Sequence, residues 1–200
     1  MKTFYYTIEQ EAKAEYKDRG SKFIAYAFPV AEAIQVKTKL QQLKKEHPKA
    51  VHHCYGYRIG MDENNFRAVD DGEPAGTAGK PILGQIDNRG LTNTCIIVVR
   101  YFGGSLLGVP GLINAYKTAS SLALQVVPII SKPVMKYFIL EFDYTKMNDV
   151  MQILKKYNAE VKENVLQLFS TLRVGIPQHQ LTECFYHLEN LRDVKYIAEN

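Results

Sequence analysis

The pattern of apolar and polar positions divides the first part of the chain into strands and helices. Residues 3–30 predict two or three strands, of which residues 23–30 show the alternation of a strand. The period then becomes helical, and one apolar stripe is made of Ala33, Val36, Leu40 and Leu43. Lysines occupy the opposite face. His47-Pro48 ends this predicted helix, because the residue before a proline disfavours helical backbone.

The next residues predict a hairpin, a central strand and two further helices. Tyrosine-rich residues 52–59 and residues 66–69 flank a polar turn, which is typical of a β-hairpin. Thr77 is a candidate N-cap for a short helix over 81–86. Residues 92–101 predict the central strand. A helix starts near Pro110 and is expected to run to about residue 126.

The last part of the chain predicts a strand–helix–strand unit that occurs twice. Its strands are expected at 137–142, 159–163, 165–175 and 194–198. Its helices have apolar stripes at Met147, Val150, Met151, Leu154 and Tyr157, and at Leu181, Cys184, Phe185, Leu188 and Leu191. The order βαββαβ is the ferredoxin-like split arrangement, with two helices side by side on one face of a four-stranded sheet.

A segment bracketed by prolines, residues 127–133, predicts the boundary of a two-domain α+β protein. The expected domains are 1–130 and 133–200. The net charge is +4, and all of the excess precedes the boundary. Residues 1–130 hold 16 Lys and Arg against 12 Asp and Glu, whereas residues 131–200 hold 9 of each. This distribution favours an anionic partner for the first domain.

Cysteine usage and hydropathy indicate the compartment. Cys54, Cys95 and Cys184 show no paired spacing, which favours reduced thiols over a disulfide framework or a zinc ribbon. No apolar run approaches the ~20 residues that a membrane span needs. Residues 1–15 lack the apolar segment of a signal peptide. We therefore expect a cytoplasmic protein that does not engage a membrane.

A glycine-rich loop joins the central strand to the following helix. Ile96 to Val99 is an apolar run, and Arg100, Tyr101 and Phe102 stand at its end. The loop and the helix start then contain Gly103, Gly104, Gly108 and Gly111. Such a join directs backbone N–H groups and the positive end of a helix dipole to one place. It predicts an anion site that suits phosphate or sulfate.

Two interpretations of Arg100 and the two aromatic residues after it remain open. In the first, Tyr101 or Phe102 fills the core and Arg100 pairs with an acid such as Asp71. In the second, Arg100 and the loop N–H groups hold a phosphate, and an aromatic ring stacks on a base.

Residues 70–81 do not match a known nucleotide loop. A P-loop has four residues between its first glycine and Gly-Lys, followed by Ser or Thr, but Pro81 stands at that place. Asp70, Asp71 and Glu73 would suit a metal or an acid–base pair. Carboxylates that cap backbone N–H groups of a turn are the favoured interpretation.

Three potential ligands at the start of the 52–59 strand do not predict a zinc site. His52 and Cys54 point to one side of a strand and His53 to the other, so only two ligands share a face. Zinc needs at least three. We expect no metal, no cofactor and no catalytic residue that the sequence can assign.

Two stretches together resemble the bacterial form of the IMPACT family. The first is Asp-Asp-Gly-Glu-Pro-Ala-Gly-Thr-Ala-Gly-Lys-Pro at 70–81, and the second is Val-Val-Arg-Tyr-Phe-Gly-Gly-x-x-Leu-Gly at 98–108. The turn residues of the first are Asp70, Asp71, Gly72, Glu73, Pro74, Gly76, Thr77 and Gly79. His53-x-Tyr55 and Ala115-Tyr116 also fit the family. Gly56 stands where alanine is more common, a change that we expect to matter little.

The resemblance implies a fold for each domain and a leading function. It implies a first domain similar to the second domain of a small-subunit ribosomal protein, and a second similar to the last domain of elongation factor G. Both folds recur in the translation machinery. By fold-level analogy we expect a non-catalytic factor that binds RNA or a ribosomal surface and regulates translation. The expected contacts are Lys80, Arg89, Arg100, Tyr101, Phe102, Gly103, Gly104, Gly108 and Lys117.

Two alternatives to RNA binding stay open. The chain is alternatively a hydrolase or transferase that acts on a small anionic or peptide substrate at the surface formed by 70–81 and 100–111. A further alternative is that the glycines serve only close packing of helix on strand. The two motif stretches are expected to meet in space and form one surface.

Overall fold

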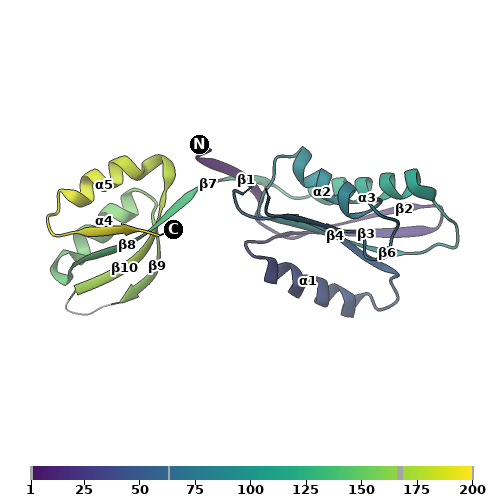
Figure 1. Ribbon diagram of the computed structural model, residues 1–200, viewed down its shortest axis with the longest axis horizontal. Helices are drawn as coiled ribbons and strands as arrows, with labels where there is room; N and C mark the ends of the chain where they lie inside the picture. The colour runs from purple at the N-terminus through teal and green to yellow at the C-terminus, as the bar shows by residue number, and fades with distance from the viewer. Residues whose placement is uncertain (1, 63, 166–168, 200) are drawn as a thin grey trace. The chain divides into compact units, whose positions relative to one another are not determined.

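A computed structural model describes residues 2–62, 64–165 and 169–199, which form two compact units (Figure 1). We call Tyr6–Ser131 the N-terminal unit. The C-terminal unit combines Met1–Tyr5 with Lys132–Asn200. Residues 2–5 therefore group with the C-terminal unit, whereas the sequence placed them in the first domain.

The N-terminal unit is built on a five-stranded antiparallel sheet. Its strand order is β2-β3-β6-β4-β5, so β6 occupies the centre, as the apolar run predicts. The strands are β2 (Ala12–Asp18), β3 (Ser21–Pro29), β4 (His52–Arg58), β5 (Phe66–Val69) and β6 (Thr94–Tyr101). β4 and β5 form the predicted hairpin.

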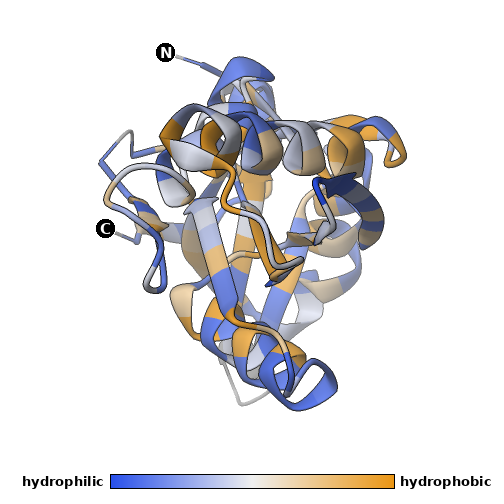
Figure 2. Cartoon of the chain, turned by 90° about the vertical axis from the view of Figure 1, so that its right-hand side faces the viewer, coloured by the Kyte–Doolittle hydropathy of each residue, from blue (hydrophilic) through white to orange (hydrophobic). Residues whose placement is uncertain are grey.

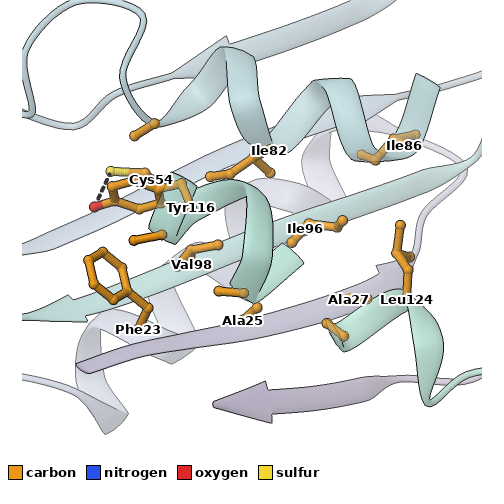
Figure 3. Packing of buried hydrophobic residues seen from close by; sticks show 14 of the residues in the cluster. Phe23, Ala25, Ala27, Cys54, Ile82, Ile86, Ile96, Val98, Tyr116 and Leu124 are labelled. Atoms are coloured by element: carbon orange, nitrogen blue, oxygen red, sulfur yellow. Dashed lines mark hydrogen bonds between the residues drawn. The ribbon is translucent and has the colours of Figure 1, made fainter. Parts of the chain in front are cut away.

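Helices cover both faces of this sheet. α2 (Gly79–Asn88) and α3 (Gly108–Gln125) lie on one face, and α1 (Ala33–Glu46) lies on the other (Figure 1). Alternate strand residues enter two separate cores because successive side chains of a strand point to opposite faces. Val98 packs with α2 and α3, whereas Val99 belongs to the core beneath α1. Figure 3 shows the first of these cores.

The C-terminal unit has the ferredoxin-like arrangement that the sequence predicts. Its sheet order is β11-β8-β10-β9, and all described pairs are antiparallel. The elements are β8 (Met135–Asp143), α4 (Met147–Lys156), β9 (Glu160–Val165), β10 (Phe169–Pro177), α5 (Leu181–Glu189) and β11 (Lys195–Ala198), with short 3-10 turns at Tyr144–Lys146 and Gln178–Gln180. Leu154 and Leu188 from the two helices are fully buried against the sheet. The α+β fold class is confirmed.

Two local expectations differ from the structure. The predicted linker contains a strand, β7 (Ile129–Pro133), which pairs with β1 (Phe4–Ile8). Helix α2 begins at Gly79, with Ala78 as N-cap, so Thr77 is not the cap and the helix starts before residue 81. Figure 2 shows orange and blue segments alternating along the helices, as expected when one side of each faces a core. Within the described ranges, no helix is both long and apolar enough to cross a membrane.

Candidate functional site

Asp70 organises the acidic turn by accepting three backbone hydrogen bonds. Its Oδ2 accepts from the N–H of Gly76 at 2.9 Å, and its Oδ1 from those of Ala78 at 3.0 Å and Gly79 at 2.8 Å. Two of these donors lie at the start of α2, where helix N–H groups have no intrahelical acceptor. Burial opposes ionisation, but the three hydrogen bonds outweigh it and lower the pKa of Asp70.

Helix α2 lies unusually close to the strands at two glycines. A Cβ atom at Gly79 would lie 2.4 Å from the backbone nitrogen of Val69. A Cβ atom at Gly56 would lie 2.8 Å from the backbone nitrogen of Leu83. Neither position accepts a methyl group without a backbone shift. Our expectation that alanine at residue 56 matters little is therefore wrong for this chain.

Glu73 joins the acidic turn to the central strand and to α3. Its Oε1 accepts a hydrogen bond from Arg100 Nη1 at 2.6 Å and another from the Tyr116 hydroxyl at 2.7 Å. The side chains of Glu73 and Arg100 are only 3% and 6% exposed. The acid that pairs with Arg100 is thus Glu73 and not Asp71. The two motif stretches meet here, as the sequence predicts.

The residues around this pair form a hydrogen-bonded shell. His52 Nδ1 lies 2.7 Å from the carbonyl oxygen of Asp71, and its Nε2 lies 3.9 Å from Glu73 Oε1. The Cys54 thiol donates to the Asp70 carbonyl at 2.9 Å and contacts the Tyr116 hydroxyl at 3.3 Å (Figure 3). Burial raises the pKa of the Cys54 thiol and that of the Tyr116 hydroxyl, so both groups are protonated at neutral pH.

His53 lies on the opposite side of β4, as the strand period predicts. Its backbone N–H donates to Asp71 Oδ2 at 2.7 Å. Burial lowers the pKa of its imidazole, and nearby Lys44 lowers it further, against the effect of Asp71. Across the described part of the chain, no three His, Cys, Asp or Glu side chains are placed to hold a metal ion.

The glycine loop, residues 102–107, packs on the turn between β2 and β3. Gly103 donates its N–H to Ser21 Oγ at 3.2 Å, and a Cβ atom there would lie 1.9 Å from the carbonyl carbon of Gly20. Gly103 therefore serves close backbone packing. Gly104 differs, because a Cβ atom placed there would have no described atom within 4 Å apart from those of its immediate chain neighbours. Helix α3 starts at Gly108, and no described side chain caps it.

The predicted cations are not gathered at one place. Arg89 donates to the carbonyl oxygens of Leu124 and Ser121, so it caps the far end of α3. With a rise of 1.5 Å per residue, that end lies about 25 Å along the helix from the glycine loop. Arg100 is buried with Glu73, whereas Lys80 and Lys117 are exposed.

The two aromatic residues at the end of β6 lie in different environments. Phe102 is 48% exposed, and the guanidinium carbon of Arg100 lies over its ring, 5.7 Å from the ring centroid. Tyr101 lies on the α1 side, where its hydroxyl is 2.8 Å from His47 Nδ1. Neither fills a core completely.

Sequence reasoning missed four residues that form one connected group with Tyr101 on the α1 side of the sheet. These are Lys13, Lys22, Tyr26 and His47, which come from β2, β3 and the end of α1. In β2 the charged residues Lys13, Glu15 and Lys17 alternate with apolar residues, which was a weak signal of a charged strand face. Their proximity depends on strand pairing across β2, β3 and β6, which no local pattern specifies.

Comparisons with known proteins match the motif-bearing region and most of the chain. The model of the Impact N-terminal domain matches residues 19–124. IMPACT family member YvyE of Bacillus subtilis is 35% identical over 80% of this chain and 73% of its own length. IMPACT family member YigZ of Escherichia coli is 33% identical over 88% of this chain and 85% of its own. A crystal structure described as that of a hypothetical protein superposes with a TM-score of 0.81, at 27% identity, over 100% of this chain and 99% of that one.

Proposed function

The chain belongs to the IMPACT family, and we propose that it is a non-catalytic, translation-associated factor whose N-terminal unit binds RNA exposed on the ribosome. The observation that carries the proposal is the open glycine loop at the start of α3. Gly104 and Gly108 leave the backbone accessible there, next to the positive end of an 18-residue helix. A phosphate of an RNA backbone suits such a site.

Exposed groups of the N-terminal unit support the same ligand. Lys117 is exposed on α3, and Lys80 is exposed at the start of α2. Phe102 offers a half-exposed ring beside the loop. The whole excess of positive charge lies in residues 1–130, so a polyanion is drawn to this unit. We assign the phosphate contacts to Lys80, Lys117 and the loop N–H groups, and none to Arg89 or Arg100.

The carboxylates of the acidic turn are bound to other groups of the protein, which places them poorly for acid–base catalysis. Asp70 accepts three backbone N–H groups, Asp71 accepts the His53 N–H, and Glu73 is buried between Arg100 and Tyr116. A catalytic carboxylate must reach a substrate atom at hydrogen-bond distance. These contacts favour the binding factor over the hydrolase or transferase.

Cosedimentation with purified bacterial ribosomes at two salt concentrations tests the proposal. We expect binding at low salt that weakens as salt rises, since each neutralised phosphate of a single strand contributes a slope of about −0.7 in log K against log salt. Lys117→Gln should make this slope shallower. Lys195→Gln, an exposed lysine of the C-terminal unit, is the matched control and should leave it unchanged. Failure to bind at low salt would contradict the proposal.

A further inference from the structure

Two lysine–tyrosine pairs lie side by side on the α1 face of the sheet. Lys13 on β2 is the cross-strand partner of Tyr26 on β3, and its Nζ lies 5.1 Å from the ring centroid. Lys22 on β3 is the cross-strand partner of Tyr101 on β6, and its Nζ lies 5.2 Å from that ring. The same combination, a cation over an aromatic ring, therefore occurs twice on neighbouring strands.

His47 at the end of α1 links the two tyrosines. Its Nε2 lies 2.7 Å from the Tyr26 hydroxyl, and its Nδ1 lies 2.8 Å from the Tyr101 hydroxyl. Both ring nitrogens are thus occupied by phenol groups, which hold the two rings in place. Because the two tyrosine side chains are already fixed, a ligand that stacks on them binds with a smaller loss of side-chain entropy. We call these five residues, Lys13, Lys22, Tyr26, His47 and Tyr101, the tyrosine platform.

The charges that face the platform are mostly positive. Burial lowers the pKa of His47, and Lys13 and Lys22 lower it further, against the opposing effect of Glu46. Lys17 adds a cation beside Lys22. Glu15 is the acid on this side of β2, and its carboxylate lies 3.3 Å from Lys17 Nζ and 3.7 Å from Lys22 Nζ. Three lysines against Glu15 and Glu46 leave a small positive excess, which favours an anionic ligand over a cationic one.

The platform continues the glycine loop. Tyr101 is the last residue of β6, and the loop starts at Phe102. Lys22 and Tyr26 are four residues apart on β3, so the platform extends about 13 Å along that strand from the loop end. A single chain of nucleotides that contacts the loop with one phosphate reaches the platform with the following bases.

We infer that the tyrosine platform is a stacking surface for unpaired bases of RNA, with Lys13 and Lys22 contacting the adjacent phosphates. The inference rests on the proposed RNA binding and names the form of RNA that the N-terminal unit selects. Single strands are selected because only unpaired bases expose a ring face for stacking on an aromatic side chain. The lysines over the two rings turn outward to the phosphates when bases take their place.

Fluorescence anisotropy with a labelled single-stranded oligouridylate tests the platform on the full chain. Tyr26→Leu and Tyr101→Leu should each weaken binding by about 5-fold to 150-fold, the range that corresponds to loss of one stacked base. Tyr26→Phe and Tyr101→Phe keep the ring but lose the hydroxyl bonded to His47, and should therefore lose less affinity than the leucine variants. Tyr186→Leu in the C-terminal unit, where Tyr186 is 64% exposed, is the matched control and should not change affinity.

The outcomes separate the platform from the proposed function. A larger loss of affinity in the leucine variants than in the phenylalanine variants supports the platform. Equal affinity of the leucine variants and the parent chain overturns the platform and leaves RNA binding by the glycine loop intact. A labelled duplex bound as tightly as the single strand also overturns it. If the parent chain binds neither RNA at low salt, the proposed function itself fails. Circular dichroism of each variant identifies any that does not fold, and the comparison of single strand with duplex on the parent chain then carries the test.

Discussion

Replacement of Glu73 by glutamine should destabilise the N-terminal unit more than any surface charge change. Glu73→Gln keeps the size of the side chain but removes the charge that compensates Arg100, whose side chain is 6% exposed. Removing one partner of a buried ion pair typically costs about 3–5 kcal/mol of unfolding free energy. The Tyr116 hydroxyl also loses its charged acceptor. For a urea slope of about 2 kcal/mol per molar, the midpoint should fall by roughly 1.5–2.5 M.

A double-mutant cycle separates the pair from its surroundings. Glu73→Met with Arg100→Met replaces both charges by apolar side chains of similar length, and such replacements are often close to neutral. We therefore expect the double variant to be more stable than either single variant. The coupling free energy should reach at least about 2 kcal/mol, at the upper part of the range for residues in direct contact.

The assay must report on the N-terminal unit alone because the chain contains two compact units. Amide hydrogen exchange of β6, followed by mass spectrometry along a urea series, provides this readout. Glu199→Gln removes the partner of Arg173 on the surface of the C-terminal unit and should leave β6 protection unchanged. The reasoning is refuted if Glu73→Gln costs less than about 1 kcal/mol, or if the double variant is less stable than both single variants.

Two further predictions concern helix packing and pH. Gly56→Ala should lower the free energy of unfolding by about 1–3 kcal/mol, because the added Cβ atom meets the Leu83 backbone. Gly84→Ala, the control in α2, adds a Cβ atom that meets no described atom within 4 Å, so it should be neutral or stabilising. Thermal unfolding of the two variants tests both expectations. Burial lowers the folded-state pKa values of His47 and His53 below 6.5. The contribution that these neutral side chains make to folding stability is therefore fully present above pH 6.5, and it is lost as pH falls through the folded-state pKa values. The melting temperature should therefore fall between pH 7 and pH 5, and His47→Gln should flatten that fall; a flat profile in the parent chain would contradict the assignment.

Hydropathy period was enough to predict most elements, because each core-facing element carries a regular apolar stripe. The stripes of α4 and α5 and the strands around them predicted the ferredoxin-like arrangement of β8–β11. The central position of β6 followed from its continuous apolar run, since a strand covered on both faces has no polar side. Gly56 shows the limit of this approach: its tight contact depends on how closely α2 approaches β4, and side-chain pattern carries no such distance.

Partners within the site were harder to predict than the elements. Asp71 and Glu73 are two residues apart in one turn, and the positive φ of Asp71, 43°, redirects the chain between them. Which acid meets Arg100 therefore depends on turn geometry that composition does not specify. Thr77 was chosen as the cap from residue type, but the distant Asp70 performs this role. Tyr26, His47 and Tyr101 come together only through sheet register and the end of α1, so no sequence pattern linked them.

Chemical-shift mapping of an unlabelled single-stranded oligouridylate onto the isotope-labelled chain tests the central claim most directly. The account predicts salt-sensitive shifts that begin at the backbone amides of Gly104 and Gly108 and extend to the rings of Tyr26, His47 and Tyr101. It also predicts that bound phosphates raise the pKa of His47 toward its ordinary value, because nearby negative charge favours the imidazolium. Shifts confined to the C-terminal unit, or their absence at low salt, would contradict RNA binding by the N-terminal unit.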